Sequence, residues 1–191
     1  MQGQKHFFAH SQKGQEAAPF ELLIAVIIMM FVLFVGLQAT DTLNKEKCKG
    51  EIDSELEELR TAVQTVATGK GQQAVGFSTP GCFGDKESST KIVDRDDRQL
   101  CSQACGGSSQ LCTLLIFTSP SFVSTKCLFI SPNTIFPIDD PCSSSAVGAE
   151  GDYDIRDLKD QRGIENGNYF LVSKHSFLSS NPIVCAYKKA K

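Results

Sequence analysis

The feature that most constrains this chain is an apolar run from Phe20 to Leu37, in which Glu21 is the only charged residue. As an α-helix, the run would extend about 27 Å, close to the thickness of the hydrocarbon core of a bilayer. A cleaved secretory signal has a shorter apolar stretch of about 7 to 15 residues, followed by small residues. The run therefore predicts a retained membrane-spanning helix near the N-terminus.

Basic residues lie on both sides of the predicted span. Lys5 and Lys13 precede it without any acidic residue up to position 14, which suits a cytoplasmic N-terminus. Lys45, Lys47 and Lys49 follow the span, so basic residues alone do not decide the orientation.

All eight cysteines follow the span. They are Cys48, Cys82, Cys101, Cys105, Cys112, Cys127, Cys142 and Cys185. An even number of cysteines on one side of a membrane helix is typical of disulfides in an oxidising compartment outside the cytoplasm. The alternative is a zinc site at residues 101–112, but the chain lacks paired C-x-x-C motifs, and only one histidine, His175, follows the span. Eight cysteines allow roughly a hundred sets of pairings, and the sequence leaves the choice open.

The junction Lys13, Gly14, Gln15, followed by PFELLIAVII, resembles the class III signal peptide of type IV pilin-like proteins, particularly archaeal ones. The resemblance covers roughly residues 10–40. It implies that a membrane-embedded prepilin peptidase cuts after Gly14, that Lys13 holds the leader at the cytoplasmic face, and that Gln15 becomes the new N-terminus. Glycine suits such a site because it permits close approach of the backbone. The alternative is an ordinary flexible tail beside the membrane.

The same resemblance marks residues for subunit assembly. Pilins keep a glutamate near the start of the apolar helix, where it pairs with the terminal amine of a neighbouring subunit. Glu21 would be the seventh residue after cleavage, later than the usual fifth, and Glu16 would be the second. The resemblance thus assigns assembly to Glu16, Glu21, Leu22 and Leu23. The alternative for Glu21 is a carboxylate that reaches the lipid headgroups, because a charge is costly inside a bilayer.

Beyond the span, the pattern changes to that of an amphipathic helix. Ile52, Leu56, Leu59, Val63 and Val66 recur at spacings of four, three, four and three. The glycines of the Gly-Lys-Gly sequence at 69–71 predict the end of this helix.

Residues 72–191 predict one small extracytoplasmic head. Runs rich in Phe, Ile, Leu and Val, separated by segments dense in Pro, Ser, Asn and Gly, indicate an antiparallel sheet. The candidate strands are 74–79, 111–118, 126–130, 134–138, 168–174 and 182–188, whereas 94–103 and 154–161 are expected to be short helices or loops.

These observations predict an α+β fold. A long N-terminal helix, membrane-spanning in its first half and amphipathic in its second, packs on a small antiparallel β-sheet head stapled by disulfides. The expected organisation is a cleaved leader at 1–14, a transmembrane or filament-core helix at 15–40, its amphipathic continuation at 41–70 and the disulfide-rich head at 72–191.

The sequence offers no catalytic, cofactor-binding or metal-binding set. His175 stands alone, without a serine elbow or a glycine-rich phosphate loop near it. The acidic runs at 94–98 and 152–160 lack the spacing of a calcium loop. The formal net charge is −3 and no basic face interleaved with aromatic residues occurs, so nucleic acid is not an expected partner.

The sequence therefore favours a structural subunit, major or minor, of an extracellular type IV-like filament used for adhesion, motility or surface contact. Its expected partners are the prepilin peptidase, identical or related pilin subunits that bind through the N-terminal helix, and the membrane before assembly. The protein would first be a single-pass membrane protein with a cytoplasmic N-terminus and then part of a filament at the cell surface. Two alternatives remain: an uncleaved, membrane-anchored extracytoplasmic binding protein, and an anchored enzyme.

Overall fold

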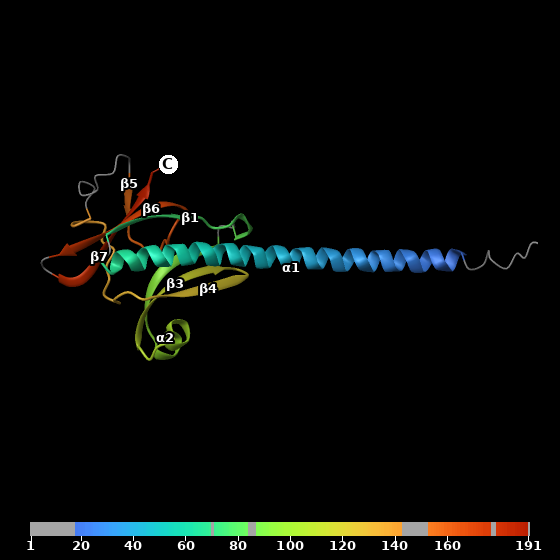
Figure 1. The fold of residues 1–191 in the computed structure, drawn as a ribbon, viewed down its shortest axis with the longest axis horizontal. Coiled ribbons are helices and arrows are strands. Elements are labelled where there is room, and N and C mark those ends of the chain that lie inside the picture. Colours follow the sequence, from blue (N-terminus) through green and yellow to red (C-terminus); the bar gives the residue numbers. More distant parts are fainter. Residues whose placement is uncertain (1–17, 70, 84–86, 143–152, 177–178, 191) are drawn as a thin grey trace, which may run out of the picture. The chain divides into compact units, whose positions relative to one another are not determined.

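The computed structural model describes residues 18–69, 71–83, 87–142, 153–176 and 179–190 (Figure 1). The chain divides into two compact units, Met1–Glu46 and Lys47–Lys191. The helix α1, Ala18–Ala67, contributes its first part to one unit and its second part to the other. The second unit also holds all the strands and is called the head below.

Local sequence features accompany both described ends of α1. Pro19 lies in the first turn, where its missing N–H costs no intrahelical hydrogen bond. At the other end, the N–H of Gly69 donates to the carbonyl of Val66, and Gly69 has a φ of 79°. This left-handed conformation is the usual way for a helix to stop, and glycine adopts it without strain. α1 thus ends beside the predicted glycines.

The head contains two antiparallel sheets. Sheet A has the strand order β1-β6-β7-β5, and sheet B has the order β2-β3-β4. Sheet A consists of β1 (Gln72–Phe77), β6 (Gly167–Ser176), β7 (Ser179–Lys189) and β5 (Tyr153–Arg156). Sheet B consists of β2 (Ser89–Asp96), β3 (Leu111–Ser119) and β4 (Phe122–Leu128). A short 3-10 helix, η1 (Gly81–Phe83), and the helix α2 (Arg98–Cys105) complete the described elements.

The second half of α1 forms the centre of the hydrophobic core of the head. The five apolar residues of its predicted stripe are fully buried: Ile52, Leu56, Leu59, Val63 and Val66. They share one cluster with residues of both sheets, such as Leu115 of β3 and Leu171 of β6. The predicted α+β fold, with a long helix packed on antiparallel strands, is therefore confirmed.

Sheet B has an α-helix on each face. Leu115 and Phe117 of β3 belong to the core around α1, whereas Cys112, Leu114 and Ile116 form a smaller cluster with α2. This alternation follows from the strand period of two, which sends successive side chains to opposite faces. Figure 1 shows α2 on the far side of sheet B from the second half of α1.

Several strand predictions were wrong in detail. Segment 134–138 forms no strand, but only an isolated bridge between Ile135 and Ile183, because Pro132 and Pro137 limit regular pairing around it. Segment 94–103, expected to be a short helix or loop, contains most of α2 but begins with the end of β2. Segment 154–161 was also expected to be a helix or loop; its first residues belong to β5, and the rest is irregular as predicted. The strands are also divided between two sheets, where the sequence predicted one.

Candidate functional site

The first candidate site is the apolar segment of α1 from Phe20 to Leu37. This helix near the N-terminus is long and apolar enough to span a membrane, and none of its most apolar stretch is buried. Leu22 and Leu23, two of the predicted assembly residues, are 68% and 54% exposed. Large exposed apolar surfaces of this kind normally contact lipid or another protein. By length, composition and exposure, the segment thus meets the requirements of a membrane-spanning helix.

Glu21 is the single charge in this apolar segment and lies in the first turn of α1. Its side chain is exposed and makes no hydrogen bond or ion pair with any other residue that the structure describes. A carboxylate in the first turn is stabilised by the unpaired N–H groups and the positive end of the helix dipole. No described residue therefore competes with an outside partner for Glu21.

The predicted cleavage residues lie outside the described residues. This applies to Lys13, Gly14 and Gln15, and also to Glu16, the other acidic residue assigned to assembly. Their roles stay predictions.

A second group of residues fixes the helix to sheet B. Asp53 of α1 accepts hydrogen bonds from Ser124 Oγ at 2.6 Å and from Lys126 Nζ at 3.1 Å. Partial burial raises the pKa of Asp53, but the hydrogen bonds from Ser124 and Lys126 outweigh that effect, so its pKa lies below the ordinary value. The pairing therefore stabilises the ionised carboxylate as well as the helix position.

Arg60, two turns further along α1, makes the next link to sheet B. Its Nε donates to the carbonyl of Cys127 at 2.8 Å, and its Nη1 binds Glu57 Oε1 at 2.7 Å. The guanidinium also lies over the ring of Phe129, 5.4 Å from the centroid. The edge strand β4 is thereby held against α1 by side chains.

All eight cysteines form disulfides, which confirms that interpretation over a zinc site. The pairs are Cys48–Cys82, Cys101–Cys112, Cys105–Cys127 and Cys142–Cys185. Each bond joins elements that are separate in the fold. Cys48–Cys82 links α1 to η1, and Cys142–Cys185 fixes the segment after β4 to β7.

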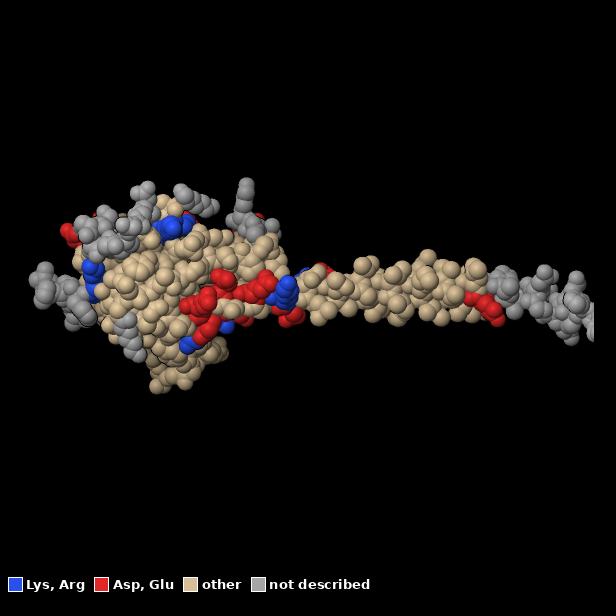
Figure 2. Space-filling model, turned by 45° about the horizontal axis from the view of Figure 1, so that its top comes forward, with Lys and Arg blue, Asp and Glu red and all other residues tan. Residues whose placement is uncertain are grey.

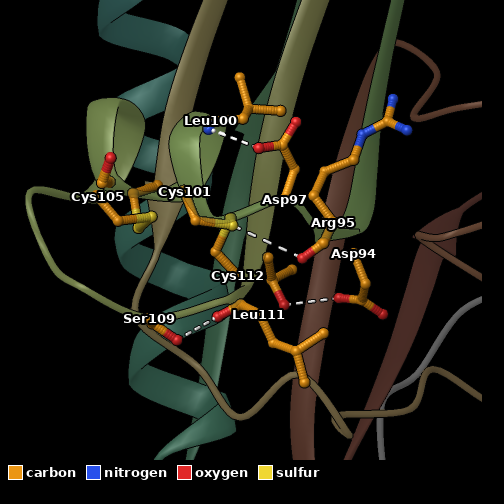
Figure 3. Close-up of a disulfide and its surroundings, with 12 residues drawn as sticks. Asp94, Arg95, Asp97, Leu100, Cys101, Cys105, Ser109, Leu111 and Cys112 are labelled. Atoms are coloured by element: carbon orange, nitrogen blue, oxygen red, sulfur yellow. Dashed lines mark hydrogen bonds between the residues drawn. A yellow bond between two sulfur atoms is a disulfide. The ribbon is translucent and has the colours of Figure 1, made fainter.

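Two of the disulfides hold α2 on sheet B. Cys101 bonds to Cys112 of β3, and Cys105, one turn further along α2, bonds to Cys127 of β4. Figure 3 shows the first of these bonds beside the start of α2, where Asp97 Oδ1 caps the helix by accepting from the N–H groups of residues 99 and 100. This short helix is thus fixed at both ends.

The loop between β5 and β6 connects the two sheets. The N–H of Ile164 donates to the carbonyl of Thr90, and that of Ile92 donates to the carbonyl of Leu158. Gly163 has a φ of 78°, and a Cβ at this position would lie 2.6 Å from the Thr90 carbonyl oxygen. Only glycine fits this crossing without movement of the backbone.

The surface of the head has a groove of about 450 Å³ between α1 and β1. Its α1 wall includes Glu57, Glu58, Thr61 and Thr65, and its other wall is the segment 73–76 of β1. Acidic side chains also form a band on the face of the head drawn in Figure 2. The groove itself is acidic on its α1 wall, where Glu57 and Glu58 lie, and is bordered by an edge strand.

The described residues hold no group of three or more His, Cys, Asp or Glu side chains that could bind a metal ion. The side chain of His175 lies outside the described residues. No family model, curated protein or solved structure matches this chain.

Sequence reasoning missed the links between Asp53 and β4 and the groove at β1. Asp53 occurs in a run of charged residues that resembles a solvated helix face, so only its position beside the apolar stripe could have pointed to a partner. The groove depends on which strand lies at the sheet edge, and the sequence carries no local signal for strand order.

Proposed function

We propose that this protein is a pilin-like structural subunit of an extracellular type IV-like filament. The observation that carries the proposal is the exposed apolar segment from Phe20 to Leu37, with Glu21 in its first turn, on the same helix that supplies the core of the head. A subunit of a helical filament needs both parts: one half of the helix for contact with its copies and the other half to hold a folded domain.

The apolar segment would lie in the membrane first and in the filament afterwards. A prepilin peptidase would remove residues 1–14 at the cytoplasmic face, and α1 would then exchange lipid contacts for contacts with the same helix of other subunits. In lipid, helix association depends on packing and polar contacts, because the hydrophobic effect gives no preference for protein over lipid. Glu21 would supply the polar contact by binding the terminal amine of a neighbouring subunit.

The disulfides support a location of the head outside the cytoplasm, because such bonds persist in oxidising compartments. A head stapled at four places also suits a surface structure exposed to proteases and shear. The role proposed here is structural and involves no catalytic step.

Cleavage is tested by mass spectrometry of the protein from membranes and from sheared surface material. The mature chain should begin at Gln15, and Gly14→Val should leave the leader attached. Gly3→Val, a matched change within the leader, should not affect cleavage. A mature chain that still begins at Met1 would contradict the proposal and favour a membrane-anchored binding protein.

Assembly is tested separately with the carboxylate in the apolar segment. Glu21→Gln should allow cleavage and insertion but greatly reduce the amount of protein recovered in sheared, sedimenting filaments. Glu51→Gln, at an exposed position of α1 in the head, serves as the control. If Glu21→Gln assembles like the wild type, the proposed pairing with a neighbouring subunit is wrong.

A further inference from the structure

The two sheets have four edge strands, β1 and β5 in sheet A and β2 and β4 in sheet B. An edge strand presents unpaired N–H and C=O groups, and proteins usually protect it with charges, proline, short length or a covering segment. The protection of these four edges is unequal.

Three of the edges are protected. β2 is covered by the loop between β5 and β6, which makes backbone hydrogen bonds to residues 90 and 92. β4 is covered by side chains of α1, including Arg60, which binds the carbonyl of Cys127. β5 has only four residues, and two of them, Asp154 and Arg156, are charged.

Within its six residues, β1 has none of these protections, although Glu55 of α1 accepts a hydrogen bond from the N–H of Ser78 just beyond its end. Its sequence, QQAVGF, contains no charged residue and no proline. No backbone hydrogen bond joins its free side to any other described residue. Among the residues that the structure describes, none pairs with the free side of β1, which is therefore called an open edge below.

The register shows which groups of β1 are available. The N–H of Ser173 donates to the carbonyl of Gly71, so Gly71 faces β6 in the ladder. In an antiparallel pair, every second residue faces the partner. The N–H and C=O groups of Gln72, Ala74 and Gly76 consequently point to the free side.

The groove between α1 and β1 lies along this free side. The side chains of Val75 and Phe77 point into the core, so α1 lies beneath the sheet and its exposed flank extends beyond the edge of β1. An added strand would pair with β1 and contact this flank. The short side chains of Thr61 and Thr65 leave room for it there. The four residues of β1 in the groove span about 10 Å at 3.4 Å per residue.

The negative charge on this flank of α1 indicates the charge of a peptide that would bind in the groove. Glu57 and Glu58 line the groove, and Glu58 makes no ion pair within the described part of the chain, whereas Glu57 is bound by Arg60. Side chains of a strand alternate between its two faces, so every second residue of an added strand would point toward these carboxylates. Pairing of β1 with β1 of a second copy would instead bring two acidic flanks together.

We propose that β1 is an acceptor edge for an extended peptide segment with Lys or Arg at alternate positions, which adds to sheet A as a fifth strand. Main-chain hydrogen bonds to Gln72, Ala74 and Gly76 supply the affinity, and Glu58 supplies the charge preference, as in other cases of β-strand addition. The site belongs to the folded head and requires neither cleavage at Gly14 nor filament assembly.

The test uses the full chain in detergent micelles and a fluorescein-labelled heptapeptide of alternating Lys and Val as the probe. Fluorescence anisotropy should show saturable binding that weakens with added salt. A peptide with N-methyl groups on the alternate residues that face β1 should bind at least tenfold more weakly, and so should a peptide with Glu in place of Lys. Equal binding of the N-methylated peptide, or no saturable binding of the Lys-Val peptide, would overturn the proposal.

Two variants test the acceptor side. Ala74→Pro removes an N–H that points to the free edge, so it should lower the affinity at least tenfold while the β1–β6 ladder remains. Ala74→Ser is the matched control and should bind within about twofold of the wild type. Glu58→Lys should weaken binding of the Lys-Val peptide and strengthen binding of the Glu-containing one. If folded Ala74→Pro binds like the wild type, β1 is not the acceptor.

Discussion

Two leucines of α1 allow a sharp test of the division between a head core and an exposed apolar segment. Leu56 is fully buried among residues of both sheets, whereas Leu43 is 70% exposed. Both positions are helical, and alanine has at least the helix propensity of leucine, so Leu→Ala does not weaken the helix at either position. The two substitutions therefore differ in the packing that they remove.

Leu56→Ala should lower the free energy of unfolding of the head by about 3 kcal/mol, within the range of about 2 to 5 kcal/mol for a leucine removed from a packed core. For a domain of this size, the loss corresponds to a fall in Tm of roughly 6 to 12 °C. Leu43→Ala should change the free energy of unfolding by less than about 0.5 kcal/mol, because little of that side chain is packed.

The measurement is guanidinium chloride unfolding followed by circular dichroism, with both variants and the wild type in the same detergent. The slope of the free energy against denaturant should stay constant, so that a change in midpoint reports stability. Equal effects of the two substitutions, or a loss below about 1 kcal/mol for Leu56→Ala, would refute the assignment of the second half of α1 to the core of the head.

Further predictions concern the cross-links, one titrating group and one backbone crossing. Replacing both Cys48 and Cys82 by Ala opens a loop of 34 residues and should cost roughly 4 kcal/mol in guanidinium unfolding; an unchanged midpoint would contradict this. The pKa of Asp53 is lower in the folded state, so the stability that it contributes should be present above its unfolded pKa and lost as the pH falls through its folded pKa. Asp53→Asn should remove this part of the acid dependence of unfolding. Gly163→Ala should lower stability by about 1 to 3 kcal/mol, because the added Cβ meets the Thr90 carbonyl and φ is positive; a Tm equal to that of the wild type would show that the crossing is not tight.

The helical part of this fold could be predicted from the sequence because its signals are local. The spacing of Ile52, Leu56 and Leu59 along the chain repeats the helical period, and all three are buried in the core. The glycines after position 68 likewise marked the end of α1 through their own backbone conformation.

Part of the β structure could not be predicted, because its strands have weak apolar patterns. β2 buries Thr90 and Ile92 between charged and polar neighbours, so no strand was predicted there, and its last residues, 94–96, were assigned to a helix or loop. β5 is similar, with Asp154 and Arg156 among four residues. Segment 134–138 is the converse case, a predicted strand that does not form. It has the apolar character of a strand, but prolines lie within and near it, and it forms a single bridge.

The candidate sites divide in the same way. The exposed apolar segment and Glu21 were found from composition alone, since neither depends on tertiary contacts. The disulfide partners, the pairing of Asp53 with β4 and the open edge of β1 depend on how distant segments meet. Local sequence patterns contain no information on such long-range contacts, even when every residue that takes part in them has been identified as a candidate.

The manner in which α2 is attached has a consequence for the evolution of the surface. Cys101 and Cys105 fasten this helix to sheet B, and Asp97 caps it, so its position does not depend on apolar packing alone. Among its eight residues, Cys101 is the buried one, and the turn at 106–110 that follows is exposed. Substitutions on the outward side of α2 and in this turn should therefore be tolerated, because the two cross-links hold the helix on the sheet whatever its outer surface carries.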